Sequence, residues 1–180
     1  MTPEHIINFW FSEITPKQWW VKDPEFDQRL NDRFGETLKQ AAACELNGWR
    51  INVEGRLAEI IVLDQFSRNI YRDTAAAFAQ DSLALALSQE ALAADALARL
   101  ASDDMRTFLL MPYMHSESAA IHKSAEVLFK KYTPQNNYEF ELKHKAIIDR
   151  FGRYPHRNDL LGRESSDEEI EFLKGPGSSF

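Results

Sequence analysis

The chain has 180 residues, 44% of them hydrophobic and 12% aromatic, so it can bury the core of one domain spanning residues 1–180. Its net charge of −7 and pI near 5.3 argue against binding to nucleic acid, because an acidic protein repels the phosphate backbone. Cys44 is the only cysteine, which excludes an internal disulfide and a cysteine-based zinc site.

The sequence carries no feature of export or membrane insertion. Residues 1–11 lack the basic and long apolar regions of a signal peptide. No apolar run approaches the roughly 20 residues that span a bilayer. We therefore expect a soluble, cytoplasmic protein that does not bind membranes. Cys44 lies in an alanine-rich run, which predicts a packed, unreactive thiol.

Capping residues followed by proline predict the first three helices, at Thr2-Pro3, Thr15-Pro16 and Asp23-Pro24. The third helix has apolar residues every three or four positions and is expected to end at Asn47-Gly48. A fourth helix is expected from about residue 53 to 66. Asp64 and Arg68 extend its apolar face by one and two turns, and an aspartate at such a position is unusual.

The middle of the chain predicts shorter helices capped by aspartates, the first at Asp81. The run MRTFLLM is expected to stop at Pro112, because the residue before a proline disfavours helix. This break would deliver His115, and Ser116 or Ser118 would then start the next helix. Glu117 lies one turn before Ile121, on the apolar face of that helix.

The last third begins with a turn at residues 133–137, and His144 lies on the apolar face of the helix that follows. Gly152 is expected to end that helix, and Tyr154-Pro155 to keep residues 156–158 extended. Ser165 or Ser166 predicts a capping box for a short acidic helix. No strand pattern appears, so we expect an all-α fold of about eight antiparallel helices in hairpin pairs.

Three segments carry the candidate chemistry: Asp64–Asn69, His115–Glu117 and His144–Arg163. The last segment has a net charge of +3 in an acidic chain, with its polar residues set among apolar ones. Buried charges are costly unless paired, so the segments indicate either a ligand site or a structural ion-pair network. The candidate catalytic residues are Asp64, His115 and His156. The candidate ligand-binding residues are Arg68, Asn69, Glu117, His144, Arg150, Arg153, Arg157 and Asn158.

Other patterns favour structural roles. His122 and Glu126 are four residues apart and are expected to form a solvated pair. The aromatic residues between Phe9 and Trp20 are expected in the core. No ligand spacing indicates a metal site, and there is no glycine-rich phosphate loop, serine nucleophile elbow or dinucleotide fingerprint. The sequence leaves the cofactor undetermined.

Several motifs resemble the bacterial family called domain of unknown function 924. They are Phe9-Trp10-Phe11, Trp20–Asp27, Leu63–Arg72, Met111–Glu117, Arg150–Asn158 and Pro176–Phe180. The resemblance implies stacked helix hairpins similar to tetratricopeptide repeats, around a concave face, and implies no activity. Ser67 departs from the family pattern, which has proline there, so the helix after Asp64 is expected to end less sharply.

Two functions are open at this point. In the first, arginines bind a small anionic metabolite while His115, His156 or Asp64 moves a proton, as in a hydrolase or lyase. In the second, the chain is a scaffold for a protein partner, and the charged cluster is a buried network without a ligand. Polar residues gather at helix ends around broken segments, which suits a compact pocket better than a peptide groove.

Overall fold

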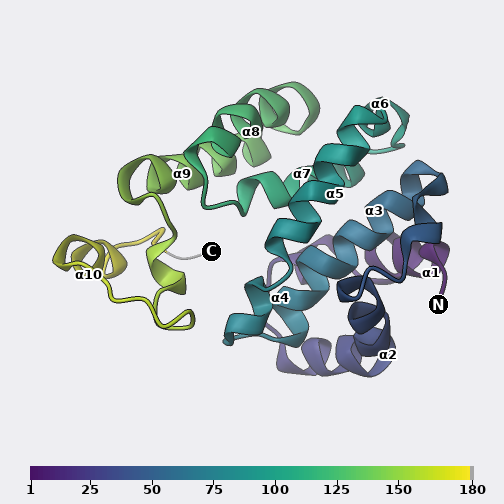
Figure 1. The fold of residues 1–180 in the computed structure, drawn as a ribbon, viewed down its shortest axis with the longest axis horizontal. Coiled ribbons are helices and arrows are strands. Elements are labelled where there is room, and N and C mark those ends of the chain that lie inside the picture. Colours follow the sequence, from purple (N-terminus) through teal and green to yellow (C-terminus); the bar gives the residue numbers. More distant parts are fainter. Residues whose placement is uncertain (179–180) are drawn as a thin grey trace.

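The computed structural model describes residues 1–178, and every regular element in that part of the chain is helical (Figure 1). The expected all-α class is confirmed. The α-helices are α1 (Pro3–Asn8), α2 (Pro24–Ala42), α3 (Val53–Ile61), α4 (Ser67–Ile70), α5 (Asp81–Ala93), α6 (Ala96–Arg99), α7 (Asp103–Met114), α8 (Ala119–Tyr132), α9 (Gln135–Phe151) and α10 (Asp167–Leu173). Between them lie π-helical turns at Phe9–Glu13 and Val62–Phe66, and 3₁₀ turns at Pro16–Trp19, Asn47–Ile51, Ala75–Phe78 and Pro155–Arg157.

Two helices, α2 and α10, begin at capping residues that the sequence predicts. The Asp23 carboxylate accepts hydrogen bonds from the backbone N–H groups of Glu25 and Phe26, at 3.0 and 3.2 Å. These donors have no partner inside the first turn of α2, so the cap stabilises its start. Ser166 and Glu169 form the expected capping box of α10.

Helix α3 lies among α1, α5 and α7, and α2 packs against α4 and the π-helical turn Val62–Phe66 (Figure 1). The chain then continues through α7, α8 and α9, each packed on the next. Helix α10 contacts the turn Pro155–Arg157, at the far end of the molecule from α1. The turn Val62–Phe66, which contains Asp64, packs against α2, α3, α4 and α5.

Aromatic rings from the π-helical turns Phe9–Glu13 and Val62–Phe66, and from α2 and α7, pack together in the core. Phe34 contacts both Phe9 and Phe66, with ring centroids 4.8 and 5.1 Å apart. Trp10 packs edge-on against Phe108 at 5.5 Å. The aromatic residues near the N-terminus therefore belong largely to the core, although Trp20 is exposed.

The prediction that Pro112 ends a helix is wrong. Helix α7 continues through Pro112 to Met114, and all residues from Thr107 to Met114 are buried. A proline inside a helix costs about 3 kcal/mol, because it removes a hydrogen bond and crowds the preceding turn. Burial of this apolar run offsets that cost, and the helix delivers His115 at its C-terminus.

Three other local predictions are also wrong. Pro155–Arg157 forms a 3₁₀ turn instead of an extended segment, because proline is favoured at the first position of a helical turn. Helix α2 ends at Ala42, before Asn47-Gly48, and Cys44 is exposed with a positive φ of 60°. The thiol of Cys44 is therefore not packed in a helix.

Candidate functional site

Asp64 lies in the π-helical turn between α3 and α4, and its side chain is 1% exposed. Its Oδ1 atom lies 2.7 Å from Nδ1 of His115 and 3.1 Å from Nη1 of Arg68. Gln65 donates a hydrogen bond to Oδ2 at 2.6 Å. Ser67 begins α4, which carries Arg68 one turn beyond Asp64, as their spacing predicts. Isolated π-helical turns often occur at functional sites.

A second carboxylate, from Asp81 at the start of α5, bridges two arginines. Arg68 donates to both Asp81 oxygens, at 2.8 and 3.0 Å, and Arg157 donates to Oδ2 at 3.1 Å. The Phe78 ring lies against both guanidinium groups, 4.5 Å from Arg157 and 5.8 Å from Arg68. The sequence pattern indicated Asp81 only as a helix cap, placed Gln65 in a candidate segment without a role of its own, and gave no signal for Phe78.

Side chains from the C-terminal half hold the backbone around His115 at the end of α7. Tyr154 donates its hydroxyl hydrogen to the carbonyl of Met114, and Arg157 donates to the carbonyl of His115 at 3.1 Å. His122 Nε2 lies 2.8 Å from the carbonyl of Ser116. Three consecutive carbonyl groups thus have side-chain donors, which restricts the position of the imidazole.

The surroundings favour a neutral His115 beside an ionised Asp64. Burial and the charge of Arg68 lower the pKa of His115, against the opposing effect of Asp64. Burial opposes ionisation of Asp64, but the charge of Arg68 and the hydrogen bonds from His115 and Gln65 hold its pKa below the ordinary value. An ionised carboxylate can only accept a hydrogen bond, so the proton of the neutral imidazole lies on Nδ1. This leaves the lone pair on Nε2.

Atom Nε2 of His115 is the ring nitrogen that does not contact Asp64. None of the described residues forms a hydrogen bond with it, and the imidazole side chain is 12% exposed. An imidazole held by a carboxylate at one nitrogen and accessible at the other is the arrangement of a general base. The Asp64–His115 pair can therefore accept a proton from a molecule at the Nε2 side.

A neighbouring cluster contains Glu117 and Asn158. Glu117 accepts two hydrogen bonds from Arg163, at 2.6 and 2.9 Å, and one from the Tyr154 backbone N–H at 2.7 Å. These donors lower the pKa of Glu117, although burial opposes them. Asn158 accepts from Arg163 at 3.0 Å and donates to Ser165. The cluster joins the segment after α7 to the chain after α9.

The expected solvated pair of His122 and Glu126 is wrong. His122 is fully buried, and its Nδ1 atom lies 2.7 Å from the carboxylate of Glu141, which is also fully buried. Helix α9 packs on this side of α8 and supplies Glu141, a contact that spacing within α8 does not indicate. Burial raises the pKa of Glu141.

The remaining candidates lie in other surroundings. The rings of His144 and His156 flank Tyr154, with centroids 5.8 and 5.7 Å away, and burial lowers their pKa values to about 3 and about 4. Asn69 donates to the carbonyl of Gln65. Arg150 of α9 binds Glu168 of α10, and Arg153, which follows α9, binds Glu169 of α10. Both pairs lie outside the cluster around Asp64.

The profile of the family described as bacterial protein of unknown function (DUF924) matches residues 6–177. The chain belongs to this family. A solved structure, that of the protein of unknown function ATU0120 from Agrobacterium tumefaciens, matches with a TM-score of 0.91 and 36% sequence identity. The match covers 96% of this chain and 97% of that one. A search of curated proteins found no match. The last motif of the resemblance ends at Ser179-Phe180, outside the described residues.

In this DUF924 protein, residues 1–178 contain no group of three His, Cys, Asp or Glu side chains placed to hold a metal ion. No helix in that range is long and apolar enough to cross a bilayer. The cluster around Asp64 consists instead of two carboxylates, two guanidinium groups and one imidazole, from Asp64, Asp81, Arg68, Arg157 and His115. Such groups can bind an anion and move a proton without further ligands.

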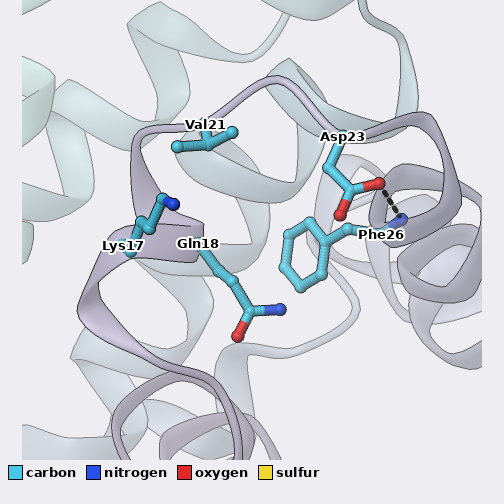
Figure 2. Close-up of a pocket in the computed structure, with 5 residues that line it drawn as sticks. All are labelled: Lys17, Gln18, Val21, Asp23 and Phe26. Carbon is cyan, nitrogen blue, oxygen red and sulfur yellow. Dashed lines mark hydrogen bonds between the residues drawn. The ribbon is translucent and has the colours of Figure 1, made fainter.

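Two surface hollows of the DUF924 protein lie apart from this cluster. One, of about 250 Å³, is lined by Lys17, Gln18, Val21, Asp23 and Phe26 (Figure 2). Its carboxylate already caps α2 (Figure 2). The other, of about 300 Å³, is lined by Asp103, Arg106, Lys131, Tyr132 and Thr133. Neither hollow is lined by a residue of the Asp64 cluster.

Proposed function

We propose that this protein binds a small anionic metabolite and acts on it by acid–base chemistry, with His115 as the proton acceptor. The observation that supports this most is the Asp64–His115 pair, whose Nε2 atom bonds none of the described residues. A purely structural histidine at an interior position is expected to use both ring nitrogens, as His122 does.

His115 would take the proton on Nε2 and become an imidazolium ion. The Asp64 carboxylate, 2.7 Å from Nδ1, would stabilise that positive charge and hold the ring in one orientation. The proton would come from a water molecule in a hydrolytic reaction, or from a carbon next to a carbonyl group in a lyase reaction. Either step needs a base that is neutral near pH 7, which agrees with the lowered pKa of His115.

The anion would bind to Arg68 and Arg157. Both guanidinium groups lie within one cluster with His115, because Arg68 reaches Asp64 and Arg157 binds the His115 carbonyl. Atom Nε of Arg157 is buried and has no hydrogen-bond partner among the described residues. A buried donor of this kind is costly unless a ligand or water satisfies it.

A thermal-shift screen against small carboxylates and phosphates at millimolar concentration tests anion binding. A ligand at 100 times its Kd should add about 2.7 kcal/mol of stability. At about 2–4 °C per kcal/mol, this raises the Tm by roughly 5–11 °C. Arg157→Ala should abolish the shift. Arg153→Ala, which removes an arginine bound to Glu169 outside the cluster, should retain it.

Nuclear magnetic resonance of the imidazole groups tests the role of His115. We expect His115 near pH 7 to be neutral, with its proton on Nδ1, and its signals to move when an anion binds. His115→Gln should leave anion binding in place but abolish any turnover of the bound compound. A doubly protonated His115 at pH 7, or a proton on Nε2, would rule out the proposed base.

The alternative is a scaffold for a protein partner in which this cluster is only a buried network. The charges of Asp64, Asp81, Arg68 and Arg157 cancel when His115 is neutral, which favours this alternative. Removing one member would then cost about 3–5 kcal/mol, because its partner stays buried and unpaired. Under this alternative Arg157→Ala lowers the Tm strongly, and no anion in the screen shifts the Tm of the wild type.

A further inference from the structure

We propose that Asp81 is an exchangeable internal ligand, whose carboxylate occupies the position where the carboxylate group of the substrate binds Arg68 and Arg157. This inference rests on the proposed function, which assigns the anion to these two arginines. It adds the class of the ligand, a carboxylate, and a means of control, since Asp81 must leave before the ligand binds.

The contacts of Asp81 are those of a bound carboxylate ligand. The flat guanidinium group of Arg68 faces both Asp81 oxygens, at 2.8 and 3.0 Å, and Arg157 adds a third contact at 3.1 Å. This paired arrangement matches the shape of a carboxylate. No other described side chain donates to the Asp81 carboxylate, so a ligand carboxylate could reproduce every bond that Asp81 makes.

Charge favours a carboxylate over a phosphate. Asp64 and Asp81 balance Arg68 and Arg157, so exchanging one carboxylate for another keeps the cluster neutral. A phosphate dianion in the same place would leave one excess negative charge beside the buried Asp64. An unbalanced buried charge is strongly unfavourable, so the cluster should discriminate against it.

Asp81 can leave more easily than Asp64. Its side chain is 18% exposed against 1% for Asp64, and it is the first residue of α5. Its release breaks only the contacts with the two arginines, and a ligand carboxylate then restores both these contacts and the charge balance. Asp64, by contrast, is held by Gln65 and His115 as well as by Arg68.

The segment before α5 would move together with Asp81. Phe78 lies three residues earlier, in the 3₁₀ turn Ala75–Phe78, and its ring packs on the same two guanidinium groups. The segment from Phe78 to Asp81 thus supplies the ring and the carboxylate that cover Arg68 and Arg157. Arg157 has a further donor for an incoming ligand, since its side chain is 7% exposed and its buried Nε atom has no partner among the described residues.

Removal of the Asp81 carboxylate tests the exchange. Asp81→Ala should lose thermal stability in sodium chloride and regain it in sodium acetate or formate at equal ionic strength, with saturation. If Asp81 covers the site in nine molecules of ten or more, its removal should tighten acetate binding about tenfold or more relative to the wild type. Asp81→Asn, which keeps the size of the side chain, serves if the alanine variant fails to fold.

Asp27→Ala is the matched control. Asp27 also binds an arginine through both oxygens, at 2.6 and 2.8 Å from Arg72, but lies outside the cluster. Saturable recovery by acetate in the Asp81 variants and not in Asp27→Ala would support the exchange. Equal recovery in both, no gain in affinity at Asp81, or recovery by phosphate alone would overturn it.

The proposed function can fail separately from this inference. If acetate binds Asp81→Ala tightly but the His115 signals do not move, the exchange holds and the role of His115 as a base is refuted. If the wild type binds a carboxylate beside His115 but Asp81→Ala binds it no more tightly, the proposed function holds and the exchange is refuted.

Discussion

Replacing Asp64 by asparagine is the most informative test of the buried cluster. The substitution keeps the size of the side chain and removes one negative charge at a position that is 1% exposed. The carboxylate of Asp64 accepts hydrogen bonds from Gln65 and His115 and pairs with Arg68. Asparagine leaves the cluster with one unbalanced positive charge.

The expected loss of stability follows from these contacts. Breaking a buried ion pair by removing one partner costs about 3–5 kcal/mol. Arg68 keeps its two bonds to Asp81, so we expect the lower end of that range, about 3 kcal/mol. This corresponds to a Tm lower by roughly 6–12 °C, at about 2–4 °C per kcal/mol for a chain of this size.

Urea denaturation followed by circular dichroism measures this loss. The midpoint should fall by about 1–3 M while the slope of the transition stays constant. Glu13→Gln is a matched control, because it also neutralises a carboxylate bound to an arginine, Arg33, but both side chains are exposed. That control should cost far less than Asp64→Asn, because an exposed ion pair is solvated and screened.

The dependence on pH gives a second check. The pKa of Asp64 lies below its ordinary value of 3.8, so its contribution to stability is complete above about pH 4 and is lost as the pH falls further. The difference between wild type and Asp64→Asn should stay constant from about pH 7 to 5. A cost no larger than that of Glu13→Gln would refute the reasoning, because the charges of the cluster would then be as well solvated as surface charges.

Three further predictions concern Tyr154, two buried histidines and the cap of α10. Tyr154→Phe removes a hydroxyl group that donates to the carbonyl of Met114, and it should lower the free energy of unfolding by about 1–2 kcal/mol, measured by urea denaturation. The control Tyr113→Phe should cost less, because the Tyr113 hydroxyl bonds none of the described residues. Burial lowers the pKa values of His144 and His156 to about 3 and about 4 from 6.5, so the unfolded chain binds more protons below pH 6.5. Stability should fall by roughly 2 kcal/mol per histidine between pH 6.5 and 5, and a urea midpoint that stays constant over this range would contradict the prediction. Ser166→Ala removes the cap of α10 and should cost about 1 kcal/mol by the same assay, and an unchanged midpoint would exclude a role of this cap in stability.

Local patterns in the sequence predicted most helix starts and the unusual position of Asp64. Asp23 and Ser166 cap helices because their side chains reach backbone donors only two or three residues away. Asp64 follows the apolar face of its helix, and this periodicity was enough to indicate burial and its pairing with Arg68. The prediction failed at Pro112, where burial of the surrounding residues outweighs the local preference of proline.

The sequence by itself determined the helical class and placed Asp64, Arg68 and His115 among the candidate residues, because residue type and helical spacing carry that information. Only the tertiary structure decided their partners. Asp81 bridges Arg68 and Arg157, which lie 13 and 76 residues away, and His122 pairs with Glu141 on the next helix. The tertiary structure also pairs Arg150 and Arg153 with glutamates of α10 instead of with the cluster around Asp64. Such contacts depend on which helix faces pack together, and no local pattern specifies that choice.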